Sequence, residues 1–203
     1  MKSRSFELAI NRDAASGVLT EANGITLKIE RKPGDCPRCP RLRVMGNNFE
    51  LELLPTKGLT IGEAIIDGLS VFWEPPIDLV DPDELDLGSD AVRINGEPAA
   101  GFEFLKTFAG SVELYGLRNW GMPVRDGDRR LPLHGETSNI PVEAVRVEIS
   151  ENQIDISADF TYRSFEGDTD QPWYLRGEPL FQVERTVRIL PEQKRLLVFD
   201  EFQ

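Results

Sequence analysis

The sequence predicts an all-β protein built from two stacked antiparallel sheets, and three observations support this prediction. Several runs alternate apolar and polar residues with the period of two that is typical of half-buried strands. Glycines and prolines interrupt these runs at short intervals. No stretch keeps a 3.6-residue apolar period over three turns, so we expect at most a few short helical turns.

The first half of the chain contains five predicted strands. In most of them apolar residues alternate with polar ones, and a glycine or a proline ends the run. The strands are expected over Phe6–Asn11, Ile25–Arg31, Phe49–Leu53, Lys57–Gly62 and Ala64–Trp73.

Residues 74–101 have a different character and are predicted to form a long acidic loop. Their run EPPIDLVDPDELDLGSD carries three prolines and seven acidic residues without a sustained period. A loop of this length is unusual inside a compact domain, so two interpretations stay open: a mobile segment, or a flap packed over a site. After the loop, Phe102–Phe108 is expected to form a turn of helix and Ser111–Leu117 a strand.

Two hairpins are predicted in the second half of the chain. The first joins residues 145–149 to residues 154–162, which alternate on either side of a polar turn. The second joins residues 181–189 to residues 195–202 in the same way. Arg185 interrupts the apolar face of the second hairpin.

The segment Leu117–Asn139, LRNWGMPVRDGDRRLPLHGETSN, has the composition of a binding loop. It gathers arginines, asparagines, a tryptophan and the only histidine of the chain, His134, among glycines and prolines. A loop held by flanking strands can direct such side chains at a ligand, because glycine and proline set unusual backbone angles. A solvated, charged connection between strands explains the same composition, so both interpretations stay open at this point.

Size and charge limit the classes of protein and partner. A chain of 203 residues with 40% hydrophobic and 29% charged residues is expected to form a single domain over residues 1–203. Its net charge of −12 argues against nucleic acid and anionic membranes as partners, because both are bound through basic surfaces. No apolar run is long enough to span a membrane, and Met1–Asn11 lacks the apolar core of a secretory signal. We therefore expect a cytoplasmic location.

Cys36 and Cys39 form a lone CPRC motif in a proline-rich stretch. A structural zinc site needs four ligands, and the chain offers no second cysteine pair and only one distant histidine. A redox motif is expected beside a βαβ pattern, which the sequence lacks. We expect two reduced thiols in a turn, and neither a metal nor another cofactor.

Four blocks in order resemble a known family: LPTKGLTIGEAIIDGLSVFW, FLKTFAGSVELYGLRNWG, LPLHGETSN and VERTVRILPEQKRLLVFDEF. Together they are similar to the galactose mutarotase-like superfamily, specifically to a little-characterised branch related to aldose 1-epimerases, over roughly residues 45–203. The resemblance implies a large antiparallel β-supersandwich that binds sugars in a cleft on one sheet. The chain departs from the branch at three positions, where Lys57 replaces arginine, Thr60 replaces aspartate and Glu136 replaces a frequent arginine.

The resemblance assigns catalytic roles in mutarotation, which needs an acid at the ring oxygen and a base at the anomeric hydroxyl. His134 matches a family histidine that contacts the sugar near the ring oxygen, and histidine suits the acid role. The aldose 1-epimerases also use a second histidine and a glutamate base that lie later in the sequence. Glu136 is the candidate replacement base, because it shares a face with His134 if that segment is extended. A histidine that only bonds a backbone carbonyl is the alternative for His134.

Five further residues are expected to bind the substrate, and each has a structural alternative. Trp73 is predicted either to stack on a sugar or to lie in the core. Asn119 and Asn139 contact the ligand or form turns, and Arg118 binds it or belongs to a solvated charged face. Lys57 is the fifth residue expected to bind the substrate, because it stands where the family branch usually has arginine.

The resemblance and the candidate residues predict two alternative functions from different classes. The first is an aldose 1-epimerase type of isomerase that interconverts sugar anomers, and the second is a non-catalytic carbohydrate-binding module or an inactive fragment of a longer mutarotase-like protein. The chain stops inside a predicted strand, a little past the middle of a normal family member. We therefore expect either association with a second copy through the C-terminal strand edge or a longer gene product.

Overall fold

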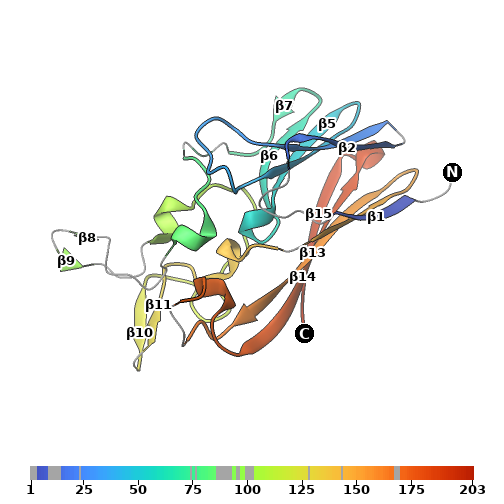
Figure 1. Cartoon of the computed structure of the whole chain (residues 1–203). Helices are drawn as coiled ribbons and strands as arrows, with labels where there is room; N and C mark the ends of the chain where they lie inside the picture. The colour runs from blue at the N-terminus through green and yellow to red at the C-terminus, as the bar shows by residue number, and fades with distance from the viewer. Residues whose placement is uncertain are drawn as a thin grey trace.

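The computed structural model describes residues 4–8, 15–22, 24–73, 75, 77–85, 93–94, 97–98, 103–127, 129–142, 144–166 and 170–203. These residues form two antiparallel sheets stacked face to face, with the shorter elements gathered beyond one end of the stack (Figure 1). The all-β prediction is confirmed. In the part of the chain that the structure describes, every helical element is a short 3₁₀ turn, and no helix is long and apolar enough to cross a membrane.

The N-terminal sheet is a six-stranded meander in which each strand pairs with the next along the chain. Alternate residues of its strands point inward, as the buried Ile25, Leu27 and Ile29 do in β3 and the buried Leu42 and Val44 do in β4. The strands are β2 (Gly17–Ala22), β3 (Ile25–Glu30), β4 (Arg41–Met45), β5 (Phe49–Leu54), β6 (Thr60–Ile66) and β7 (Leu69–Ser70).

The C-terminal sheet has five strands in the order β1-β12-β13-β14-β15. Both predicted hairpins are confirmed, since β12 pairs with β13 and β14 pairs with β15 in antiparallel register. The strands are β1 (Arg4–Leu8), β12 (Val145–Ile149), β13 (Ile154–Arg163), β14 (Pro179–Leu190) and β15 (Arg195–Phe202).

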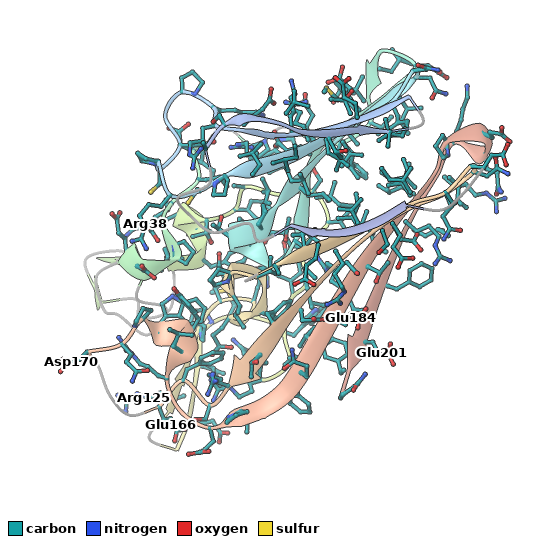
Figure 2. All side chains as sticks on the ribbon, turned by 45° about the vertical axis from the view of Figure 1, so that its right-hand side comes forward. Arg38, Arg125, Glu166, Asp170, Glu184 and Glu201 are labelled. Atoms are coloured by element: carbon teal, nitrogen blue, oxygen red, sulfur yellow. The ribbon has the colours of Figure 1, made fainter. Side chains whose placement is uncertain are left out.

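The core lies between the two sheets, where their inward-facing side chains meet (Figure 2). Leu27, Leu42 and Leu53 from one sheet and Val147 and Ile156 from the other are all buried. Arg185, which interrupts the apolar pattern of β14, is also buried and is bound by Asp200 of β15 through Nε at 2.6 Å and Nη2 at 3.0 Å. A charge can occupy this position because its counter-ion lies on the paired strand.

Within the described ranges, six 3₁₀ turns and two small hairpins lie between the strands of the two sheets. The turns are η1 (Pro55–Lys57), η2 (Pro82–Glu84), η3 (Glu103–Lys106), η4 (Thr137–Asn139), η5 (Trp173–Leu175) and η6 (Pro191–Gln193). The hairpins pair β8 (Arg93–Ile94) with β9 (Glu97–Pro98), and β10 (Val124–Asp126) with β11 (Arg129–Leu131).

Three strand predictions are wrong in part. The strand expected over Ala64–Trp73 is not separate, because β6 continues through Gly62 to Ile66 and only Leu69–Ser70 follow it as β7. The strand expected from Lys57 begins only at Thr60, because Pro55 opens the turn η1 and the left-handed Gly58 and Leu59 then redirect the chain. The strand expected over Ser111–Leu117 is reduced to two isolated bridges, Ile61 to Val112 and Gly116 to Gly135.

The acidic loop predicted over residues 74–101 falls only partly within the described residues. Residues 77–85, the longest described part of this loop, are packed: Leu79 and Leu85 are buried. The indole of Trp173 donates to the Pro82 carbonyl at 2.9 Å, and the Tyr174 hydroxyl donates to Asp83 at 2.7 Å. This part of the loop therefore lies against η5.

Candidate functional site

The candidate site lies on two segments, residues 111–116 and the loop that presents His134. Backbone hydrogen bonds join these segments to each other, and they join residues 111–116 to the N-terminal sheet. The Ser111 amide donates to the Ile61 carbonyl at 2.7 Å, and its hydroxyl donates to the carbonyls of Gly62 and Trp73. Further along, the Gly116 amide donates to the His134 carbonyl at 2.9 Å. These bonds hold residues 111–116 between strand β6 and the loop that presents His134.

The backbone and the imidazole of His134 are both fixed. The residue has a positive φ of 58°, its amide donates to the Gly121 carbonyl at 2.9 Å, and its Nδ1 lies 3.0 Å from the Trp120 carbonyl oxygen. Since a carbonyl only accepts hydrogen bonds, Nδ1 carries the hydrogen. No described residue bonds Nε2.

A row of aromatic side chains connects His134 to the protein surface. Phe104 packs edge-on against the imidazole with ring centroids 5.2 Å apart, Phe108 follows at 5.7 Å from Phe104, and Trp73 at 5.4 Å from Phe108. Tyr115 contacts both His134 and Phe104. Trp73 is 51% exposed and Phe108 is 38% exposed, so the core alternative for Trp73 is wrong. Phe104 in the middle of the row is buried, whereas the imidazole of His134 at the other end is partly exposed, so both ends of the row reach the surface.

Lys57 and Asn139 form a second group, and this group is buried. Lys57 Nζ donates to the Thr107 carbonyl at 2.6 Å and to Asn139 Oδ1 at 3.2 Å, and it lies 3.4 Å from Glu113 Oε1. Burial lowers the pKa of Lys57, and the Glu113 carboxylate opposes that shift. The Asn139 Nδ2 and both Glu113 oxygens have no hydrogen-bond partner among the described residues.

Arg118 and Glu136 belong to a third group, centred on Tyr162. The buried Glu136 carboxylate accepts from Arg118 Nη2 at 3.0 Å and from the Tyr162 hydroxyl at 3.0 Å. Arg118 also donates to the Ser164 carbonyl at 3.0 Å and lies over the ring of Phe165. Burial, followed by the Glu136 charge, raises the pKa of Tyr162. Arg118 is therefore neither a solvated charge nor a free anion clamp.

The premise that placed Glu136 on the same face as His134 is wrong. The segment is not extended, because His134 and Gly135 both have a positive φ and Thr137–Asn139 follows as a 3₁₀ turn. The two side chains consequently have different neighbours: His134 touches aromatic rings, whereas Glu136 binds Arg118 and Tyr162.

Asn119 shapes the loop around His134. Its Nδ2 donates to the Pro132 carbonyl at 2.5 Å and to the Met122 carbonyl at 3.1 Å, and its Oδ1 accepts from the Gly121 amide at 3.4 Å. These bonds join the two ends of the hairpin β10–β11, which supports the turn-forming alternative for this residue.

Sequence reasoning missed the aromatic neighbours Phe104, Phe108, Tyr115 and Tyr162, and it missed Glu113. Its carboxylate is buried beside Lys57, and together with burial it raises the pKa of Tyr115 to about 12. The only signal was an acidic residue between the apolar Val112 and Leu114. That pattern is compatible with a solvated strand face, so it does not indicate a buried partner for Lys57.

The CPRC turn holds two free thiols. Cys39 Sγ donates to the Val80 carbonyl at 3.4 Å, and burial raises the pKa of this thiol to about 12. Cys36 Sγ lies 3.8 Å from Asp81 Oδ2. Among the described residues no group of three or more histidine, cysteine, aspartate or glutamate side chains could hold a metal ion.

Comparison with solved structures places this fold among the mutarotase-like sandwiches. A protein from Klebsiella pneumoniae subsp. pneumoniae MGH 78578, described as a "putative aldose 1-epimerase", superimposes with a TM-score of 0.70 at 16% sequence identity. The match covers 99% of this chain and 51% of that protein, so the chain spans about half its length. No curated protein matches the chain.

The family is defined by a sequence model. The model described as "Domain of unknown function (DUF4432)", a galactose mutarotase-like family, matches residues 40–202. The chain belongs to this family, and the resemblance expected from its sequence blocks is confirmed.

Proposed function

We propose that this chain binds an aldose on the surface formed by Trp73 and Phe108 and that His134 helps to interconvert its anomers. The observation that supports the proposal most is the partly exposed imidazole at one end of the aromatic row, with Nδ1 bound to the Trp120 carbonyl and Nε2 bonded by no described residue. The family and the structural neighbour support the same class of ligand.

The ligand class follows from the surface itself. Aromatic rings pack well against the apolar C–H faces of a sugar ring, and the half-exposed Trp73 provides such a ring. A neutral ligand also suits a chain with a net charge of −12, which repels anionic substrates. Lys57 and Arg118, expected from the sequence to bind substrate, would not contact the ligand directly, because other protein groups engage their charges. Asn139 binds Lys57 through Oδ1, and its Nδ2 has no partner among the described residues.

The reaction requires two proton movements and no cofactor. A base removes the proton from the anomeric hydroxyl while an acid protonates the ring oxygen, and the bond between the anomeric carbon and the ring oxygen breaks. Rotation about the next carbon–carbon bond and closure with the reverse proton transfers give the other anomer. In its doubly protonated form His134 would donate from Nε2 to the ring oxygen and then accept the proton again on closure.

A non-catalytic carbohydrate-binding module is the second candidate function, and one observation favours it. Both oxygens of Glu136, the candidate base, accept hydrogen bonds from Arg118 and Tyr162 inside the protein. A carboxylate that is held in this way is a poor base towards a ligand at the surface. In the binding module the aromatic row would hold the sugar while no group removes the anomeric proton.

Saturation-transfer NMR on the 203-residue chain with D-galactose and D-glucose tests catalysis. We expect anomeric exchange above the uncatalysed background, and a loss of about 10²- to 10⁴-fold in His134→Ala, the range of general acid catalysis. An unchanged rate in His134→Ala would show that the histidine is structural. Exchange that never exceeds background, combined with sugar binding, would select the binding module.

Binding is tested separately by titrating the same sugars and following the protein chemical shifts. Trp73→Ala should weaken binding about threefold to tenfold, because a stacked ring contributes about 0.5–1.5 kcal/mol beyond area burial. Trp120→Ala is the matched control: this tryptophan is 78% exposed, and only its backbone carbonyl contacts His134. Equal losses in the two variants, or no binding of any aldose to the wild-type chain, would contradict the proposed site.

A further inference from the structure

Cys36 and Cys39 stand at the two ends of one β-turn. The Cys39 amide donates to the Cys36 carbonyl at 2.9 Å, and Pro37 and Arg38 form the turn between them. The end residues of a β-turn have Cα atoms less than about 7 Å apart, and a disulfide needs Cα atoms about 4.4–6.8 Å apart. The Cys36 side chain also lies within hydrogen-bonding reach of the Cys39 thiol. The turn therefore fits the geometry of a disulfide between its two ends.

The two thiols differ in exposure. Cys36 is half-buried, whereas Cys39 is fully buried among apolar neighbours. An oxidant from the solvent therefore reaches Cys36 first. Burial raises the pKa of the Cys39 thiol to about 12, so this thiol keeps its proton and is protected from the oxidant. An accessible thiol beside a second thiol that can resolve its oxidised form is typical of redox-sensitive pairs.

Both thiols are hydrogen-bonded to the acidic loop. Cys39 Sγ donates to the Val80 carbonyl at 3.4 Å, and Cys36 Sγ donates to Asp81 Oδ2 at 3.8 Å. Arg38, labelled in Figure 2, adds an ion pair from the same turn to Asp81 at 3.1 Å. A disulfide carries no S–H group, so oxidation would remove both thiol hydrogen bonds and leave the ion pair in place.

We propose that Cys36 and Cys39 form a reversible disulfide when the protein meets hydrogen peroxide, and that this cross-link loosens residues 79–81 of the acidic loop. The Cys36 sulfur attacks one peroxide oxygen and the O–O bond breaks, which gives a sulfenic acid, while the thiol proton leaves with the hydroxide as water. The Cys39 sulfur then attacks the Cys36 sulfur and the S–O bond breaks, while the Cys39 proton leaves with the second hydroxide as water. The two thiols give up two electrons in total, and one peroxide is reduced to two waters.

The small size of the ring favours a cross-link that is easily reversed. The disulfide would close a turn of four residues, and a loop this short constrains the unfolded chain little. A thiol reductant such as glutathione should therefore return both cysteines to the free form by thiol–disulfide exchange. The site is independent of sugar binding, because neither thiol belongs to the aromatic row or contacts His134.

Peptide mass spectrometry of the 203-residue chain tests the cross-link. After peroxide treatment the wild-type chain should yield a peptide with Cys36 joined to Cys39 that is lighter by two hydrogens, and dithiothreitol should restore the reduced peptide. In Cys39→Ser, Cys36 should instead give a sulfenic acid that dimedone traps, whereas in Cys36→Ser the buried Cys39 should stay unmodified. Absence of the joined peptide, cross-links only between two chains, or equal oxidation of Cys39 in Cys36→Ser would each overturn the proposal.

Hydrogen exchange tests the loosening of the loop. Peptides that contain residues 79–81 should exchange at least about threefold faster in the oxidised chain, because one or two hydrogen bonds to the loop are lost. The matched control is Cys36→Ser/Cys39→Ser, in which hydroxyl groups replace the thiols and no cross-link can form. Peroxide should leave exchange in this variant unchanged, although its methionines are oxidised as in the wild-type chain. Identical exchange in the oxidised and reduced wild-type chains, or an equal response in the control, would overturn the proposal.

Discussion

Replacing Lys57 by methionine removes one charge from a buried pair and leaves the other without compensation. Lys57 Nζ is bound to the Thr107 carbonyl at 2.6 Å and to Asn139 at 3.2 Å, and it is the cation beside Glu113 at 3.4 Å. Both Glu113 oxygens already lack a hydrogen-bond partner among the described residues. In Lys57→Met the Glu113 charge would therefore be buried with neither a counter-ion nor a donor.

The expected loss in the free energy of unfolding follows from this buried arrangement. Removing one partner of a buried ion pair destabilises a protein by about 3–5 kcal/mol, mainly because the remaining charge is left unpaired. The double variant Lys57→Met/Glu113→Gln contains no buried charge at this position, so it should recover at least about 2 kcal/mol of that loss. The two substitutions should thus be strongly non-additive.

Urea unfolding monitored by tryptophan fluorescence measures both values. With an m value of about 2–3 kcal/mol/M, Lys57→Met should lower the midpoint by about 1–2 M. Lys194→Met is the matched control, because this exposed lysine pairs with the exposed Asp67 and its loss should change stability by about 0.5 kcal/mol or less. A Lys57→Met variant as stable as the control, or a double variant whose loss equals the sum of the singles, would refute the buried-pair reasoning.

Three further perturbations test the framework around the site. Asp200→Asn should cost about 3 kcal/mol in the same unfolding assay, since it leaves the buried Arg185 without its counter-ion, and an unchanged midpoint would contradict this. Gly135→Ala should destabilise the protein by at least about 2 kcal/mol and shift the His134 resonances, because φ is +80° and the added Cβ would lie 2.6 Å from the Gly116 carbonyl oxygen. Tyr115 has a pKa raised to about 12, so the unfolded chain loses the phenol proton at a lower pH than the folded chain does, and the free energy of unfolding should fall as the pH rises from 10 to 12. Tyr115→Phe should make this fall with pH less steep. Equal slopes in the wild-type chain and in Tyr115→Phe would show that another group causes the fall.

Local sequence patterns predict the sheets well, because the alternation of apolar and polar residues within a strand indicates which of its faces is buried. The alternation in residues 145–149 and 154–162 is enough to identify the hairpin, since its two strands are adjacent and the turn between them is short. Strand β4 was not predicted, although Leu42 and Val44 alternate with Arg41 and Arg43; the partners of these arginines, Glu52 and Glu63, lie on other strands. Interactions of this kind depend on pairing across the sheet, which a local pattern does not contain.

The residues of the candidate site likewise fall into those that local patterns indicated and those that depend on contacts between distant segments. The resemblance identified His134, and the composition of residues 117–139 indicated a loop with polar side chains. The separation of the remaining residues into distinct groups depends on contacts between distant segments, such as Arg118 with Tyr162. The environment of Trp73 was equally hidden, because a tryptophan at the end of an apolar run is as common in a core as at a surface.

The sequence left two interpretations of the 117–139 loop open, a binding loop and a charged connection between strands. In the structure each of them describes some of the residues of the loop. Asn119 and the Gly116–Gly135 bridge use the polar and glycine content of the loop to fix its backbone. Glu136 and Arg118 satisfy each other beneath it, so their charges do not compete for a ligand at the surface. The imidazole of His134 keeps one nitrogen open while its neighbours are uncharged rings. A neutral, partly apolar ligand such as the proposed aldose suits that surface, because uncharged rings line it and Arg118 and Glu136 are paired with each other inside the protein.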